Sequence, residues 1–122
     1  MINFPKLNRS FKYAWEGITY SFKYNQNIKI HLIVAVVVLA FGLILGLTKY
    51  EMFSTALLII LVISAEMVNT SIEEVVDLLV DEHNEHAKIA KDVGAGMVLL
   101  ISIFAVIIGL FIFLPHILIL FS

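Results

Sequence analysis

The chain has 122 residues, of which 61% are hydrophobic, and its formal net charge at pH 7 is −2. A soluble domain of this size keeps too much surface in water to hide so much apolar area, so the composition predicts an integral membrane protein. The slight negative charge gives no support to a nucleic-acid partner, and the absence of cysteine excludes disulfides and thiolate metal sites. The length predicts a single domain over residues 1–122.

Residues 6–24 predict an amphipathic helix that lies in the membrane interface. Basic residues and a tryptophan accompany an apolar set whose members are three or four positions apart, which places that set on one helical face. The apolar set is Leu7, Phe11, Trp15, Ile18 and Phe22. An ordinary soluble amphipathic helix is the alternative, and the long apolar run that follows favours the interfacial interpretation.

Three long apolar runs follow, and each is long enough to cross the hydrocarbon core of a bilayer as a helix. They cover residues 30–47, 52–80 and 93–121, and they are joined by a short turn at 48–51 and a polar connection at 81–92 that could be partly helical. Basic residues are concentrated before the first run, and two lysines occur in the 81–92 connection. The positive-inside rule therefore predicts a multi-pass protein whose N-terminus and 81–92 connection are cytoplasmic.

A stripe of polar residues enters the second spanning run. Glu66, Asn69, Glu73 and Asp77 are three, four and four positions apart, so they share one helical face. If Met52 lies near the outer surface, Glu66 is about 21 Å deeper, inside the hydrocarbon, and Glu73 is about 31 Å deeper, at the cytoplasmic interface. The stripe therefore joins a membrane-embedded acid to acids that water-soluble ligands can reach.

The depth of each acid suggests its chemistry. A carboxylate at the depth of Glu66 costs at least about 2.5 kcal/mol, so it must face protein, water or a ligand, and it could act as a general base on a lipid hydroxyl. Glu73 could bind Mg²⁺ together with nucleotide phosphates, and Lys91 could neutralise phosphate charge. The alternatives are a neutral packing role for Glu66 and a solvated helix end for the lower acids. Glu74 and Asp81 occupy a neighbouring stripe and are interpreted as solvated interfacial charges.

These residues resemble the prokaryotic diacylglycerol kinase and undecaprenol kinase family of small membrane enzymes. The resemblance rests on the run EMVNTSIE at 66–73 with Asp77, on the AKD sequence at 90–92, and on WEG at 15–17 with the stretch 27–31. It covers nearly the whole chain, and no P-loop or soluble-kinase motif is present. It implies an all-α homotrimer in the bacterial plasma membrane, with active sites between subunits, that transfers phosphate from MgATP to a membrane lipid alcohol.

The resemblance also implies a role for each site residue. Glu66 would be the general base, Glu73 would bind Mg²⁺ and so hold the nucleotide phosphates, and Asn69 and Asp77 would support the site. The implied nucleotide contacts are Tyr13, Glu73, Glu82, His83, Asn84, Lys91 and Asp92. The family usually has a second acidic metal ligand before the first spanning helix. That position is Asn25 here, which offers a carbonyl oxygen without charge and is therefore a doubtful metal ligand.

The lipid acceptor and the functional class have alternatives. The stretch 27–31 resembles the Gram-positive branch of the family, which favours undecaprenol, whereas diacylglycerol is the acceptor favoured by the enterobacterial branch. A small proton-coupled transporter or channel subunit could also use a membrane glutamate. Such a protein would need neither the second acid seven residues away nor the Lys-Asp pair at 91–92. A catalytically idle homologue is a third interpretation, which Asn25 makes conceivable.

Overall fold

The computed structural model describes all 122 residues, as four helices and no strands. The helices are α1 (Phe4–Tyr24), α2 (Gln26–Leu45), α3 (Lys49–Leu79) and α4 (Glu85–Leu120). By length and composition, α2, α3 and α4 are each able to cross a membrane. The structure thus confirms the predicted fold class, an all-α protein with three membrane-spanning helices after an N-terminal amphipathic helix.

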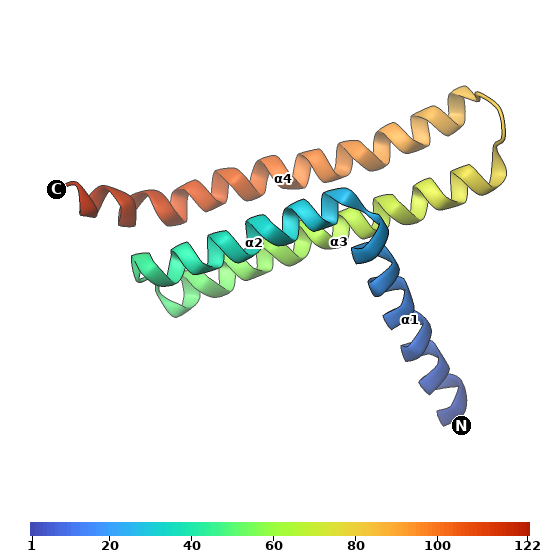
Figure 1. Cartoon of the computed structure of the whole chain (residues 1–122), viewed down its shortest axis with the longest axis horizontal. Coiled ribbons are helices and arrows are strands. Elements are labelled where there is room, and N and C mark those ends of the chain that lie inside the picture. The colour runs from blue at the N-terminus through green and yellow to red at the C-terminus, as the bar shows by residue number, and fades with distance from the viewer.

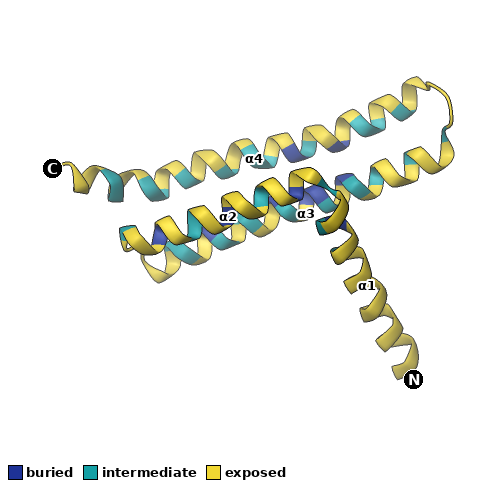
Figure 2. Ribbon diagram, viewed as in Figure 1, coloured by how far each residue is buried: buried dark blue, intermediate teal, exposed yellow.

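The central helix is α3, which packs along both α2 and α4, whereas α2 and α4 make few contacts with each other. Figure 1 shows these three helices running side by side, with α1 projecting away from the beginning of α2. Only 11 of the 122 residues are buried, and Figure 2 shows most of each helix coloured as exposed or intermediate. Many of the exposed residues of the spanning helices are large and apolar. One chain therefore has little core of its own, and lipid or other subunits must cover the rest of its apolar surface.

The break between α1 and α2 lies at Asn25. This residue has an extended backbone, and its side-chain Oδ1 accepts hydrogen bonds from the backbone N–H groups of Asn27 (2.8 Å) and Ile28 (3.2 Å). An asparagine with this geometry is an N-cap, which satisfies donors that the first turn of a helix leaves free. Consequently α2 begins before the apolar run expected at 30–47, and Asn25 is held at the junction of the two helices.

The turn expected at 48–51 is shorter than predicted. The helix α2 ends at Leu45, and Gly46 follows with φ of 74°, the left-handed conformation that often ends a helix. Thr48 Oγ1 then accepts a hydrogen bond from the backbone of Glu51 (3.2 Å), while Glu51 Oε2 accepts one from the backbone of Thr48 (2.7 Å). This capping box begins α3 at Lys49, so most of the expected turn is helical.

The polar connection expected at 81–92 is also shorter, because the chain is outside a helix only over residues 80–84. Asn84 caps α4 by accepting a hydrogen bond from the backbone of Ala87 (3.1 Å). Residues 85–92 therefore form the first turns of α4. Lys91 and Asp92 therefore belong to α4 and not to a connecting loop.

Candidate active site

A polar pocket opens where the end of α1 and the beginning of α2 meet α3. Its volume is about 280 Å³. The lining residues are Tyr20, Tyr24, Asn25, Gln26, Asn27, Glu66, Asn69, Thr70, Glu73 and Glu74. The pocket thus collects three members of the predicted polar stripe, Glu66, Asn69 and Glu73, and brings Asn25 to them from the first interhelical junction.

Glu66 is the most secluded acid of the chain, because only 2% of its surface is exposed. Its Oε2 atom lies 3.4 Å from the side-chain nitrogen of Asn25, and its Oε1 atom lies 3.5 Å from Nε2 of His31. Water hardly reaches this carboxyl group, and only two polar side chains adjoin it. A carboxylate held at the inner end of the pocket can take a proton from a substrate that reaches it.

Asn69 and Glu73 form a pair one helical turn apart on α3. The side-chain nitrogen of Asn69 donates a hydrogen bond to Oε1 of Glu73 at 3.2 Å, while Asn69 itself is 6% exposed. The second oxygen of Glu73 has no donor from the protein and lies at the exposed end of the stripe. A carboxylate oxygen of this kind can bind Mg²⁺, which commonly takes one or two protein carboxylates and completes its shell with water and substrate phosphates.

Gly94 allows α4 to approach Asn69 closely. A Cβ atom at position 94 would lie 2.5 Å from Oδ1 of Asn69 and 3.4 Å from the Ile72 side chain. The Asn69 oxygen is buried there without a hydrogen-bond partner, so the amide group would have to rotate to make room. Any such rotation would weaken the hold of Asn69 on Glu73.

The resemblance implies lipid phosphorylation, and we expect Gly94→Ala to lower the rate of that reaction by about tenfold or more, because small displacements of catalytic groups cost large factors in rate. The rate is to be measured on purified protein at saturating MgATP, with circular dichroism to verify the helix content. Gly96→Ala is the matched control, because nothing lies within 4 Å of a Cβ at that position. Equal rates for the two variants would show that the contact between Gly94 and Asn69 has no functional role.

An ion pair links α3 to α4 one turn beyond Glu73. Lys91 Nζ contacts Oδ1 of Asp77, and Lys88 makes a second pair with Asp92 along α4. All four side chains are more than a third exposed, so these pairs contribute little stability by themselves. They do place Asp77 and Lys91 next to each other, at the water-exposed end of the stripe, where Lys91 can meet an incoming phosphate.

Glu74 is exposed, as expected of a solvated charge, but it also takes part in a contact between helices. The Tyr20 hydroxyl donates a hydrogen bond to Oε1 of Glu74 at 2.8 Å, and both residues line the polar pocket. This hydrogen bond, together with the negative charge of Glu74, raises the pKa of Tyr20 above its usual value. The pair therefore ties α1 to α3 at the mouth of the pocket, a contact that the spacing along either helix does not reveal.

Six of the seven expected nucleotide contacts lie outside the pocket of this chain, which only Glu73 lines. Lys91 and Asp92 lie near the beginning of α4. Tyr13 is exposed on α1, about two turns before Tyr20. Glu82 and His83 are exposed in the 80–84 loop, and Asn84 serves as the cap of α4. Sequence reasoning also missed three residues that contact groups of the site: His31 adjoins Glu66, Thr70 accepts a hydrogen bond from Asn25, and Tyr20 donates one to Glu74.

Comparison with known proteins identifies the relatives of this chain. Residues 12–113 match the family described as prokaryotic diacylglycerol kinase. The chain is 44% identical to a diacylglycerol kinase of Synechocystis over 93% of its own length and 66% of that relative. It is 41% identical to an undecaprenol kinase of Bacillus subtilis, over 90% of the chain and 92% of the relative. It is 28% identical to a diacylglycerol kinase of Escherichia coli over 85% of each chain.

The matched region contains the polar pocket, the stripe on α3 and the beginning of α4. Three helices of this chain are able, by length and composition, to span a membrane, and the buried acid Glu66 lies on the middle one. The chain therefore belongs to the prokaryotic diacylglycerol kinase family and is a membrane lipid kinase, a phosphotransferase that uses ATP.

Proposed function

We propose that the lipid acceptor is undecaprenol and that Glu66 is the general base of the reaction. The observation that carries the mechanism is the burial of Glu66, which is 2% exposed at the inner end of a polar pocket whose outer part holds Glu73. The choice of undecaprenol is supported by the Bacillus subtilis undecaprenol kinase, which is 41% identical and is matched over 92% of its length. Diacylglycerol is the alternative acceptor, because other relatives carry that name.

The proposed reaction is a single in-line transfer. Glu66 takes the proton from the lipid hydroxyl, and the hydroxyl oxygen attacks the γ-phosphorus of ATP. The bond between that phosphorus and the bridging oxygen breaks, which releases ADP and the phosphorylated lipid. Phosphoryl transfer depends mainly on positioning and on charge neutralisation, so a few well-placed side chains are sufficient and no phosphoenzyme is needed.

The nucleotide is proposed to bind at the exposed end of the stripe. Glu73 would hold Mg²⁺, which supplies positive charge to the phosphates, and Lys91 would neutralise phosphate directly. The supporting residues would act through these two groups. Asn69 would hold Glu73 in place by its hydrogen bond, and Asp77 would orient Lys91. Further proposed nucleotide contacts are Tyr13, Glu82, His83, Asn84 and Asp92.

A homotrimer is proposed as the functional assembly. The small number of buried residues leaves apolar surface for other subunits to cover, and six of the seven proposed nucleotide contacts lie outside the pocket of their own chain. Both features are expected of a site completed between subunits. The distribution of basic residues supports an orientation in which the N-terminus and the 80–84 loop are cytoplasmic, so that ATP reaches Glu73 from the cytoplasm of a bacterial cell.

The test of the acceptor is a competition between two lipids. Purified protein in detergent micelles receives MgATP labelled at the γ-phosphate, with equal amounts of undecaprenol and diacylglycerol. We expect undecaprenyl phosphate to form faster, as measured by chromatographic separation of the labelled lipids. Predominance of phosphatidic acid would assign diacylglycerol instead. Failure to label either lipid would contradict the kinase mechanism and favour a transporter subunit or an idle homologue.

A further inference from the structure

We propose that Asn25 and His31 are positioning residues that hold the two oxygens of the Glu66 carboxyl group, one residue on each oxygen. The inference rests on the proposed role of Glu66 as the base. The side-chain nitrogen of Asn25 lies 3.4 Å from Oε2, and Nε2 of His31 lies 3.5 Å from Oε1. No other side-chain donor contacts this carboxyl group, so these two residues determine how it is oriented.

The hydrogen bonds of Asn25 fix the direction of its amide group. Its Oδ1 already accepts two backbone hydrogen bonds from the first turn of α2, which uses both lone pairs of a carbonyl oxygen. Its nitrogen donates to Oγ1 of Thr70 at 2.6 Å, and that hydroxyl donates in turn to the backbone oxygen of Glu66 at 2.9 Å. Asn25 therefore turns N–H groups toward Glu66 and has no oxygen left for a metal ion. Asn25, which replaces the acid that the family usually has at this position, therefore has a different role from a metal ligand.

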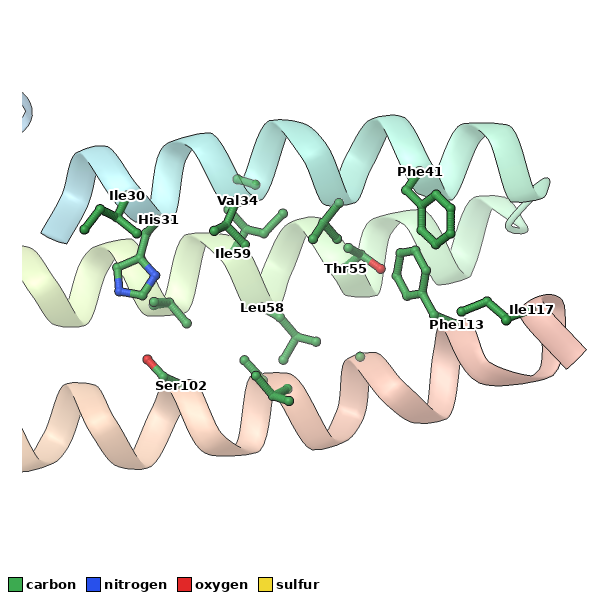
Figure 3. Close-up of a pocket in the computed structure, with 16 residues that line it drawn as sticks. Ile30, His31, Val34, Phe41, Thr55, Leu58, Ile59, Ser102, Phe113 and Ile117 are labelled. Carbon is green, nitrogen blue, oxygen red and sulfur yellow. The ribbon is translucent and has the colours of Figure 1, made fainter.

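His31 occupies the boundary between Glu66 and the hydrocarbon side of the molecule. It lines an apolar groove of about 520 Å³ that runs between α2, α3 and α4. Figure 3 shows the His31 ring at one end of this groove, pointing from α2 toward Ser102 of α4, with Phe41 and Phe113 at the other end. The His31 side chain is 29% exposed, so it can contact Glu66 and a lipid that approaches through the membrane.

The two separations are longer than the usual 2.7–3.2 Å of an N–H···O hydrogen bond, as is common at catalytic groups before substrate binds. A base must point its reactive oxygen at the hydroxyl that it deprotonates, and rotation of the carboxyl group would misplace it. Two donors on different oxygens restrain that rotation, because each donor fixes one end of the group. Loss of either donor should therefore slow the chemical step without weakening nucleotide binding.

The first test compares His31→Leu with His31→Gln. Leucine removes the donor, whereas glutamine can present an N–H group near the position of Nε2. We expect kcat for lipid phosphorylation to fall by about 100-fold with leucine and clearly less with glutamine, while KM for MgATP is unchanged. His116→Leu is the matched control, because His116 contacts Glu51 (2.9 Å) near the opposite end of α3, and this variant should retain wild-type kinetics.

The second test is Asn25→Asp, which keeps an oxygen able to cap α2 but replaces the N–H donor with a carboxylate oxygen beside Glu66. We expect a lower kcat with an unchanged dependence on Mg²⁺ concentration. Thermal unfolding in detergent shows whether each variant is folded. If His31→Leu does not fold, the positioning role is tested by the rates of His31→Gln and Asn25→Asp relative to the wild-type rate.

Distinct outcomes would overturn this inference. A His31→Leu rate equal to wild type, or equal losses with leucine and glutamine, would show that His31 does not position Glu66 through its N–H group. A tighter Mg²⁺ dependence and a faster rate in Asn25→Asp would identify position 25 as a metal site. Inactive wild-type protein would instead contradict the proposed function, so the two failures can be distinguished.

Discussion

Glu66→Gln is expected to reduce lipid phosphorylation by about 10²–10⁴-fold, close to abolition, because that is the range general-base catalysis contributes. Glutamine has nearly the size of glutamate, so it fits the same buried position. Its amide group cannot take a proton from the lipid hydroxyl. Binding of MgATP should be largely intact, because Glu73 is about two helical turns from Glu66 on α3 and Lys91 lies on α4.

The experiment measures transfer of labelled γ-phosphate to lipid and, separately, MgATP binding by calorimetry. Glu51→Gln is the matched control, because it makes the same chemical change near the other end of α3. Glutamine can also replace glutamate in a capping box, so α3 should be preserved in the control. Full kinase activity in Glu66→Gln would refute the assignment of Glu66 as the base. It would favour the alternative, in which Glu66 is a neutral packing residue.

Glu73→Ala is expected to remove Mg²⁺-dependent nucleotide binding. The unpaired oxygen of Glu73 is the proposed protein ligand of the metal, and alanine deletes both this oxygen and its negative charge. Loss of a residue that only supports a metal ligand weakens metal affinity by about 10–100-fold, so loss of the ligand itself should exceed about 100-fold. Binding of MgATP should become undetectable at concentrations that saturate the wild-type protein.

The adjacent Glu74 provides the control for this prediction. Glu74→Gln also removes one negative charge from the pocket, but Glu74 is engaged by the Tyr20 hydroxyl rather than being free. It should retain most of the MgATP affinity in the same titration. Unchanged nucleotide affinity in Glu73→Ala would exclude Glu73 as the ligand, and an equal loss in both variants would indicate a general effect of charge.

The sequence by itself determined the helical membrane class and the polar stripe, because both depend on local features. A run of apolar residues long enough to cross a bilayer must become a helix there, since lipid offers no partners for free backbone groups. The helical repeat then places Glu66, Asn69 and Glu73 on one face whatever the helix packs against. The sequence also contains the capping-box pattern of Thr48 and Glu51, which indicates where α3 begins. Residues 48–51 were nevertheless predicted to form a turn.

Only the tertiary structure decided what surrounds these groups. Asn25 and Glu66 are 41 positions apart, and their contact depends on the angle at which α1 and α2 meet α3. The same packing turns Glu74 toward Tyr20 and brings Gly94 against Asn69. Such contacts arise from the way whole helices fit together, which no local spacing encodes. For this reason the sequence located the acids, while the structure showed which of them is buried and which neighbours hold it.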